Sequence, residues 1–290
     1  MTLQTLAEKF PPLPIDELVS EIGAFSGKSE DAKQAFLRRL VMAHPIVSLD
    51  WGGGWRYRRA RPLQSDEAIS NADDTIWNKK SRPKLGRANP EGFSVIYLAD
   101  RVDTALGETH IDDQSVLLSE FQILRGQSLR IAPLGEFSQI QRTGRGLMTG
   151  DASQAVSNAL NASERDQVQS ILIADAFLLE VLTNREDDYA LSSTIAKAVF
   201  EKLPEVKAVA FPSTRTRGGL CFAVRTDDFW QTWGILSVRR VRATHLAMGY
   251  YRLTEGHHVT DITDDGTLVW EDKPDRADIV LAFEPLWTPP

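Results

Sequence analysis

One short apolar run, bounded by a turn signal and a helix signal, constrains the fold of this 290-residue chain more than any other feature. Residues 94–99 read S-V-I-Y-L-A, and because Val, Ile and Tyr are strong strand formers, this segment predicts a buried strand. The preceding N-P-E-G, at 89–92, has turn chemistry because Pro fixes one φ angle and Gly tolerates a positive one. Asp100 can then cap a helix over 101–109. We therefore expect a turn, a strand and a helix in succession.

Three polar side chains surround this predicted strand. Arg87 precedes the turn, Tyr97 lies on the strand, and Glu108 lies on the helix that follows. If the helix packs beside the strand, a cation, an aromatic ring and a carboxylate can converge, although they are not neighbours in sequence. This stretch is therefore the first candidate for a functional site.

A second block is rich in arginine. The run W-R-Y-R-R-A-R at 55–61 follows three glycines and alternates as a strand, with Arg59 and Arg61 on one face and Arg58 on the other. Arginines so close together have two interpretations. One is a solvated edge strand that uses charge to resist aggregation. The other is a cation site for phosphate, whose geometry a guanidinium matches. We favour the second because an acid and a further arginine follow.

A third block, A-F-P-S-T-R at 210–215 followed by Gly218 and Gly219, places Ser213 directly after a proline at the end of a predicted strand. Serine at such a position is common turn chemistry. A nucleophilic serine needs an adjacent base, and none of the five histidines stands at a recognisable triad spacing. The sequence therefore does not predict a serine hydrolase.

Together the three blocks resemble the RES-domain family, bacterial proteins named for an Arg, a Glu and a Ser, many of them toxins of toxin–antitoxin pairs. The family pattern of G-R-x-N, a Gly, an apolar strand with a central Tyr, and T-A-L-x-E corresponds to residues 86–89, 92, 96–98 and 104–108. The opening aromatic-R-A-R strand corresponds to 55–61, and the P-S-x-R-x-x-G-G segment to 212–219. The blocks occur in the family order.

The resemblance implies an α+β fold like that of the ADP-ribosyltransferase toxins. In that fold two small facing β-sheets, with surrounding helices, enclose the substrate. It also implies a division of this chain into three parts. These are an N-terminal helical extension over 1–50, a RES-like catalytic domain over 51–232, and a β-rich C-terminal extension over 233–290 packed on the core.

RES-domain toxins of this kind degrade NAD, so the resemblance implies an enzyme that cleaves the nicotinamide–ribose bond by hydrolysis or phosphorolysis. Nicotinamide is already a cationic leaving group, and positive charge develops on the ribose much as in glycoside hydrolysis. Carried over onto this sequence, the catalytic residues are Glu108, Arg87 and Ser213. The residues that would bind NAD are Arg59, Tyr97, Arg58 and Asn89.

Each of these residues has an implied role. Glu108 would stabilise the developing charge on the ribose. Arg59 and Arg87 would clamp the pyrophosphate. Tyr97 would stack on or bond to the nicotinamide nucleoside, and Ser213 would fix its orientation. Alignment with the family's R-A-R favours Arg59, but the arginine-rich opening leaves the choice between Arg58 and Arg59 open.

Two other functions stay open. One is an ADP-ribosyltransferase that modifies a protein, and the other is a non-enzymatic binding module on the same fold. Water, inorganic phosphate and protein are all candidate acceptors, because the acceptor adds no sequence motif. Besides NAD as substrate, no cofactor is expected. An antitoxin or immunity protein is the expected kind of protein partner.

Composition limits the kinds of partner and the cellular location that the sequence allows. A net charge of −7 argues against direct nucleic-acid binding through phosphates. The single cysteine, Cys221, excludes an internal disulfide, fits a reducing compartment and is expected to be buried in a strand. No run is apolar enough to span a bilayer, and no signal peptide is recognisable, so a cytoplasmic protein is expected. His257 and His258 stand near three aspartates, but their spacing favours a polar hairpin over a metal site.

The remaining elements follow from periodicity and turn chemistry. The N-terminal helices are expected to cap the core, with a docking face for a partner as the alternative. Loops are expected over 62–84 and 133–150, and hairpin turns at 254–256 and 264–266. Helices are expected over 16–25, 29–44, 153–161, 168–182 and 190–203. Further strands are expected over 115–124, 128–132, 207–211, 220–224 and 235–246.

Overall fold

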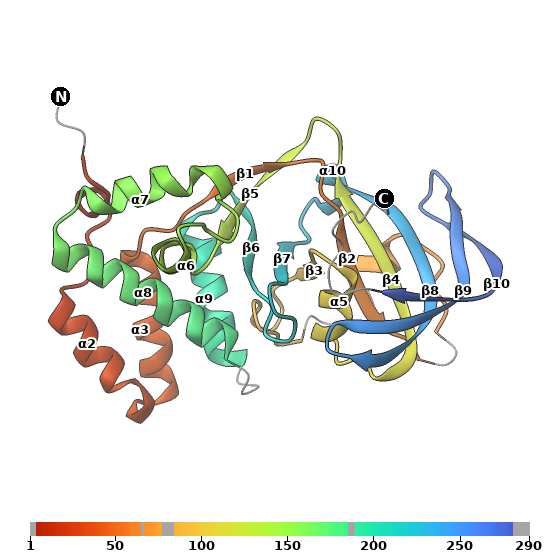
Figure 1. Cartoon of the computed structure of the whole chain (residues 1–290), viewed down its shortest axis with the longest axis horizontal. Coiled ribbons are helices and arrows are strands. Elements are labelled where there is room, and N and C mark those ends of the chain that lie inside the picture. Colours follow the sequence, from red (N-terminus) through yellow and green to blue (C-terminus); the bar gives the residue numbers. More distant parts are fainter. Residues whose placement is uncertain (1–3, 65–66, 77–83, 185–188, 281–290) are drawn as a thin grey trace, which may run out of the picture. The chain divides into compact units, whose positions relative to one another are not determined.

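The computed structural model describes residues 4–64, 67–76, 84–184 and 189–280. The chain is of mixed α and β structure, as the predicted α+β class requires. By internal contacts it divides into two units, each assembled from several segments of the chain, which are described separately below (Figure 1). Parts of the expected loop over 62–84, namely 65–66 and 77–83, lie outside the described residues.

Unit 1 comprises residues 1–51, 83–94 and 129–211 and is mainly helical. Its strand β6 (Val206–Pro212) pairs in parallel with β5 (Ser128–Pro133), and β1 (Leu49–Gly52) lies next to β5. Its α-helices are α1 (Leu6–Lys9), α2 (Ile15–Gly23), α3 (Glu30–Ala43), α6 (Glu136–Thr143), α7 (Ser153–Asn161), α8 (Arg165–Thr183) and α9 (Tyr189–Lys202). Short 3-10 turns are η1 (Phe25–Gly27) and η2 (Gly150–Ala152).

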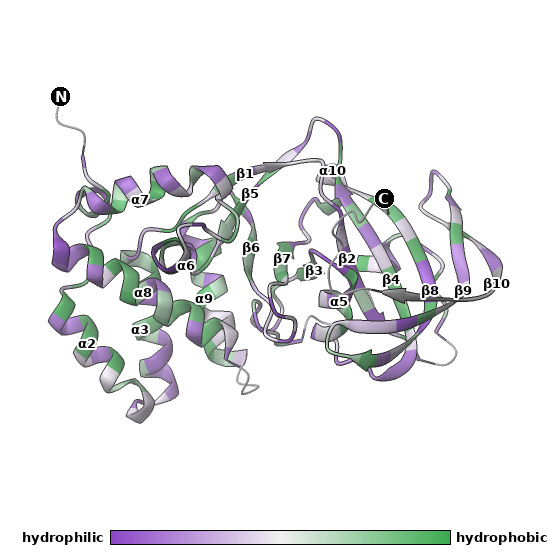
Figure 2. Cartoon of the chain, viewed as in Figure 1, coloured by the Kyte–Doolittle hydropathy of each residue, from purple (hydrophilic) through white to green (hydrophobic). Residues whose placement is uncertain are grey.

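The N-terminal helices pack within unit 1. Helix α3 begins after Ser29, whose side chain accepts from the Ala32 N–H, and packs against α8 and α9. Figure 2 shows that α2, α3 and α8 each carry hydrophobic and hydrophilic residues, the pattern of helices with one buried side. At the other end of α3, the Lys202 ammonium donates to the carbonyls of Val41, Met42 and His44 and so satisfies the free carbonyls of the helix end. The buried apolar residues of α3 are Phe36, Leu37, Leu40 and Val41.

The prediction of a loop over 133–150 is wrong, because α6 lies within it. The helix is only eight residues long and lies between two glycines of positive φ, Gly135 (81°) and Gly144 (75°). A helix this short is stabilised by tertiary packing more than by local propensity. Phe137 and Ile140 supply that packing from the core of unit 1. The glycines therefore indicate helix ends here, although they suggested a loop in the sequence.

Unit 2 comprises residues 52–82, 95–128 and 212–290 and is mainly β structure. Its strands follow the order β7-β3-β2-β4-β8-β9-β10, and each is antiparallel to its neighbour. The strands are β2 (Tyr57–Pro62), β3 (Val95–Ala99), β4 (Asp113–Ile123), β7 (Leu220–Arg225), β8 (Trp233–Ala247), β9 (Tyr250–Ile262) and β10 (Leu268–Val280). The helices are α4 (Asp73–Ile76), α5 (Val102–Glu108) and α10 (Phe229–Thr232). Two small facing sheets are not evident in this order, and that detail stays a prediction.

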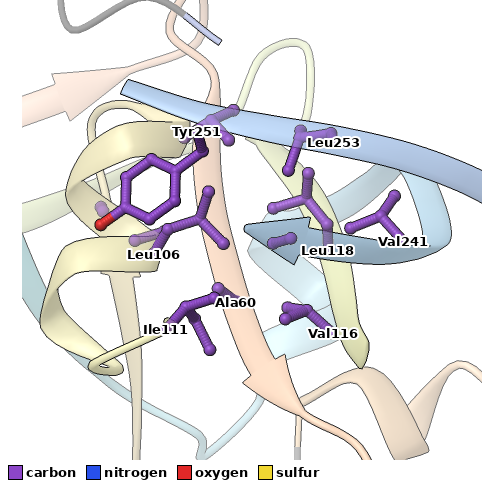
Figure 3. Packing of buried hydrophobic residues seen from close by; sticks show 12 residues of the cluster. Ala60, Leu106, Ile111, Val116, Leu118, Val241, Tyr251 and Leu253 are labelled. Atoms are coloured by element: carbon purple, nitrogen blue, oxygen red, sulfur yellow. The ribbon is translucent and has the colours of Figure 1, made fainter. Parts of the chain in front are cut away.

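Both faces of the unit 2 sheet are buried around β4, because its side chains alternate between two clusters. Val116 and Leu118 face the cluster that contains α5, whereas Leu117 faces the opposite cluster with Val238. Figure 3 shows the first cluster, in which Tyr251 of β9 lies beside residues of α5. Helix α5 is therefore fixed on the sheet by strands that come from both ends of unit 2's sequence. The labelled members of this cluster are Ala60, Leu106, Ile111, Val116, Leu118, Val241, Tyr251 and Leu253.

The hairpin turn expected at 254–256 is also wrong, because these residues lie inside β9. The pairing of β8 with β9 shifts register there: Arg240 pairs with His257, but Val241 pairs with Glu255. Gly256 is therefore the extra residue of a β-bulge, a common place for glycine in a strand. The chain turns instead between Ala247 and Tyr250, with Gly249 at a φ of 75°. The second expected turn, at 264–266, is confirmed.

The two contact-based units do not coincide with the three predicted domains, 1–50, 51–232 and 233–290. The three-domain division stays a prediction. Residues 1–51 belong to the same unit as α8 and α9, and the C-terminal strands belong to the same unit as α5. Strand β8 pairs with β4 along the full length of β4. In the part of the chain that the structure describes, no helix combines the length and apolar character needed to cross a membrane.

Candidate functional site

Glu108 is the last residue of α5, the helix that follows β3. The helix has Arg101 as its N-cap residue, one position later than the Asp100 expected from the sequence. Its apolar side chains, such as Ala105 and Leu106, are buried in the cluster of Figure 3. Residues three and four apart share a helix face, so Thr104, Gly107 and Glu108 lie together on another face.

The Glu108 carboxylate is held by residues of the third sequence block. One oxygen, Oε1, accepts three hydrogen bonds: from the Ser213 hydroxyl at 2.5 Å, the Thr214 N–H at 2.9 Å and the Arg215 N–H at 3.2 Å. Among the described residues, the other oxygen has no hydrogen-bond partner, and the side chain is partly exposed. The carboxylate is therefore fixed in direction, while one oxygen stays available.

Residues 213–219, which we call the serine loop, are organised by Ser213. Its hydroxyl oxygen accepts from the N–H groups of Arg215 at 3.1 Å and Thr216 at 2.8 Å while its proton is directed at Glu108. The Ser213 N–H donates to the Gly219 carbonyl at 2.8 Å and closes the loop. This is the hydrogen bonding of a serine turn. The hydroxyl therefore orients Glu108, and no histidine is among these contacts.

Two glycines allow the serine loop to lie close against α5. A Cβ atom on Gly107 would stand 2.7 Å from the Thr216 hydroxyl, and one on Gly219 would stand 2.5 Å from the Thr104 hydroxyl. Both distances are well below normal van der Waals contact, so a side chain at either position would push the loop away. The Gly within T-A-L-G-E and the second Gly of the third block therefore have a physical role in the site.

Sequence reasoning missed a buried carboxyl next to this site. Asp103, on α5, is only 1% exposed, and its Oδ1 lies 3.2 Å from the Arg101 guanidinium. Its Oδ2 has no hydrogen-bond partner among the described residues. Burial raises the pKa of Asp103 to about 6, against the lowering effect of Arg101. Burial and the nearby Asp103 charge also raise the pKa of Tyr251. An acid between Val102 and the small residues Thr104 and Ala105 of the predicted helix was the only signal for Asp103.

The two arginines of β2 are engaged by their own unit. Arg58 donates to the carbonyls of Arg56 and Asp100, at 3.0 and 2.6 Å, and its Nε lies 3.5 Å from a Glu120 oxygen. Arg59 donates to the Thr75 carbonyl at 2.7 Å, and burial lowers its pKa to about 10. Both guanidinium groups therefore support the backbone around β2.

Arg87 and Asn89 lie in unit 1, whereas Tyr97, Glu108 and Ser213 lie in unit 2. The Arg87 guanidinium donates to the carbonyls of Leu182 and Asn184, both at 2.8 Å, at the C-terminal end of α8. It also lies 5.6 Å from the centre of the Tyr189 ring. The Asn89 amide is buried and donates to the Lys84 carbonyl at 2.9 Å.

Tyr97 stands at the centre of β3, paired with Ala223 of β7, and is partly exposed. Of the predicted site residues, the structure thus brings Glu108 and Ser213 into direct contact. The described residues contain no group of three His, Cys, Asp or Glu side chains that could hold a metal ion, and His257 lies 3.0 Å from Asp272. Cys221 is a buried thiol in β7, as expected.

Comparison with known families agrees with these blocks. The model of the RES domain matches residues 55–233, which is more than half of the chain. The chain belongs to the RES-domain family. The Glu108–Ser213 contact and all three sequence blocks lie within the matched residues. No curated protein and no solved structure matches the chain. Because RES-domain proteins are associated with NAD-acting enzymes, membership indicates a toxin-like, NAD-related function.

Proposed function

We propose that this RES-domain protein cleaves NAD at the nicotinamide–ribose bond and so depletes cellular NAD. The observation that supports the proposal best is the arrangement of Glu108. Three hydrogen bonds hold one carboxylate oxygen, and the other has no partner among the described residues. A carboxylate fixed in this way is prepared for positive charge that develops nearby, because it need not reorient during the reaction.

The reaction suits a carboxylate without a strong acid beside it. Nicotinamide leaves as a neutral molecule from a cationic group, so its departure needs no proton. As the bond breaks, positive charge grows on the ribose, as in glycoside cleavage. Glu108 would face that charge. Ser213, whose hydroxyl donates to Glu108, would keep the carboxylate in the orientation that the ribose requires.

The other predicted residues would bind the rest of NAD. Tyr97 would contact the nicotinamide nucleoside, while Arg59 and Arg87 would act on the pyrophosphate, with Arg58 as the alternative to Arg59. A guanidinium has five N–H donors, so one that serves backbone carbonyls can still donate to a phosphate. Asn89 would also bind NAD, while its amide holds the turn before β3 by donating to the Lys84 carbonyl.

The same proposal includes the finer features implied by the family. The strands of unit 2 and their neighbours would form an ADP-ribosyltransferase-like arrangement of two facing sheets. The acceptor would be water or inorganic phosphate, and an antitoxin or immunity protein would control the activity. Transfer of ADP-ribose to a protein, and NAD binding without cleavage, are the competing outcomes of the test below.

The test is incubation of purified protein with NAD, with and without phosphate, followed by chromatography of the products. Hydrolysis gives nicotinamide and ADP-ribose, and phosphorolysis gives nicotinamide and a phosphorylated ADP-ribose. Nicotinamide release that requires an added protein would indicate a transferase instead. NAD that stays intact under every condition would contradict the proposal.

The proposal also predicts an effect in cells. Expression of the protein in bacteria should lower NAD and arrest growth, because cleavage of the cofactor pool stops metabolism. Extracts taken during expression would be assayed for NAD, with Glu108→Gln as the control. Normal NAD levels beside verified, folded protein would count against the activity.

A further inference from the structure

The serine loop exposes two arginines between buried residues. Thr214 and Thr216 are buried, at 8% and 9% exposure, whereas Arg215 and Arg217 are exposed. Alternation of this kind places the threonines against α5 and leaves the arginines outward. The loop therefore carries two positive charges within a few residues of Ser213.

The backbone that carries these arginines is fixed relative to Glu108. The Arg215 N–H donates to the Glu108 carboxylate, and the Thr216 hydroxyl lies 3.5 Å from the Asp103 carbonyl oxygen. The Cβ of Arg215 lies 3.7 Å from the position that a Cβ on Gly107 would occupy. A ligand group held by Arg215 would therefore lie near the carboxylate.

Arg215 and Arg217 differ from the predicted site arginines in what their guanidinium groups contact. The guanidinium groups of Arg58, Arg59 and Arg87 donate to backbone carbonyls. Two other arginines of unit 2 pair with acids, Arg225 with Asp227 and Arg242 with Asp113. Within the described ranges 4–64, 67–76, 84–184 and 189–280, the guanidinium groups of Arg215 and Arg217 form no hydrogen bond or ion pair.

We propose that Arg215 and Arg217 bind phosphate groups beside Glu108. An exposed guanidinium without an acid partner can meet a phosphate with two parallel N–H donors and loses no existing bond. The phosphate belongs either to the dinucleotide or to an inorganic phosphate acceptor. The first source rests on the proposed cleavage of NAD. Under either source, the serine loop adds an anion-binding part to the site, and Glu108 supplies the part that faces the ribose.

The test uses the double variant Arg215→Gln with Arg217→Gln, which keeps side-chain length but removes both charges. The control is Arg125→Gln, because Arg125 is an exposed arginine in the turn after β4, in the same unit. Arg125 lies two residues beyond Ile123, the last residue of β4, and outside the serine loop. The control therefore removes one exposed positive charge from unit 2 without changing the loop.

Titration calorimetry would measure binding of four probes by the wild type and both variants. They are inorganic pyrophosphate, inorganic phosphate, nicotinamide riboside without phosphate, and a carba analogue of NAD that resists cleavage. If the phosphate belongs to the dinucleotide, the double variant binds the carba analogue and pyrophosphate about 10- to 100-fold more weakly than the wild type does. Its affinity for the riboside is unchanged. If the phosphate is the inorganic acceptor, the double variant binds the carba analogue with normal affinity. It no longer binds inorganic phosphate, and phosphate no longer stimulates its turnover.

The proposal is overturned if the double variant binds every probe like Arg125→Gln, or if the wild type binds no phosphate-containing probe. Its failure is distinguishable from failure of the proposed function. A wild type that leaves NAD intact contradicts cleavage, but binding of pyrophosphate and phosphate still decides the role of the two arginines. Melting temperatures should be equal in all three proteins, because each substituted side chain is exposed.

Discussion

Two glutamates of this protein hold a loop by accepting hydrogen bonds from backbone N–H groups. They differ in how many of their carboxylate oxygens the loop occupies. Glu136, in unit 1, uses both oxygens: Oε2 accepts from Leu147 at 2.9 Å, and Oε1 from Met148 at 3.1 Å and Thr149 at 2.8 Å. Its side chain is only 1% exposed. Glu108, in unit 2, uses one oxygen for three hydrogen bonds and is partly exposed.

The difference separates a structural carboxylate from one that can act on a ligand. A buried charge is tolerated when hydrogen bonds satisfy it, and the three N–H groups around Glu136 do so from both sides. Both oxygens of Glu136 are occupied and buried, so this carboxylate cannot contact a ligand. Glu108 has the same kind of anchor on one oxygen only, so its second oxygen can meet positive charge without losing a bond.

The largest expected effect is that of Glu108→Gln on turnover. The amide keeps the volume of the side chain but lacks the negative charge that would stabilise the ribose. NAD turnover should fall roughly 10²–10³-fold, as on removal of one preorganised electrostatic group. Affinity for NAD should change much less, because the positive charge exists mainly in the transition state.

Turnover, NAD affinity and melting temperature would be measured on the same preparations of this variant. Near-normal turnover would remove Glu108 from the mechanism and make its free oxygen irrelevant to function. A large loss of stability would instead show that Glu108 resembles Glu136 in being chiefly a loop anchor.

Glu136→Gln should give the opposite pattern. The amide group places N–H donors where the carboxylate accepted from Leu147, Met148 or Thr149, so at least one buried group loses its partner. The free energy of unfolding should fall by about 2–3 kcal/mol, which is the order of the cost when a buried N–H group loses a charged acceptor. Turnover per folded molecule should be retained. Denaturant unfolding monitored together with activity would detect a variant that loses activity without losing stability, which would contradict this assignment.

Arg87→Ala is expected to have a smaller, mixed effect. The guanidinium satisfies the carbonyls of Leu182 and Asn184 at the end of α8, so its removal should lower stability by about 1–2 kcal/mol. If Arg87 also contacts the pyrophosphate, NAD affinity of the folded fraction should fall in addition. Calorimetric binding measured below the unfolding transition separates the two. Unchanged affinity would leave Arg87 with a structural role only.

Local sequence patterns predicted many of the elements because their causes are local. Helix α7 occupies the predicted residues 153–161, and β3 differs from its prediction by one residue. Helix α6 and the bulge at Gly256 were missed, because there the glycines serve a helix end and a β-bulge that depend on packing and on strand register. Local chemistry alone does not distinguish these uses of glycine from a turn.

The candidate site shows the same division. Glu108 and Ser213 stand 105 positions apart, so no spacing rule could pair them, and only the family resemblance placed both in one site. The arginines were overestimated as free cations, because a sequence does not show which backbone carbonyls a long side chain reaches. Asp103 and Tyr251 were missed, because the strand that carries Tyr251 follows much later in the chain than α5, and no local pattern predicts that the Asp103 charge acts on Tyr251.

The last expected effect is a gain in stability and concerns Asp103, which unlike Glu108 is buried with an oxygen that no described residue satisfies. Its pKa is about 6 in the folded protein against an ordinary value of 3.8, so the folded state binds its proton more tightly than the unfolded state does. This contribution to stability is therefore fully present below pH 3.8 and is lost as the pH rises through 6.

Asp103→Asn stays neutral, so at pH 7–8 it should be more stable than the wild type, by at most about 3 kcal/mol at 1.36 kcal/mol per pKa unit. The gain should shrink as the pH falls toward 4, where the wild-type carboxyl is also neutral. Unfolding free energies of both proteins between pH 4 and 8 would test this. A variant that is less stable at every pH would show that the ion pair with Arg101 outweighs the burial of the charge.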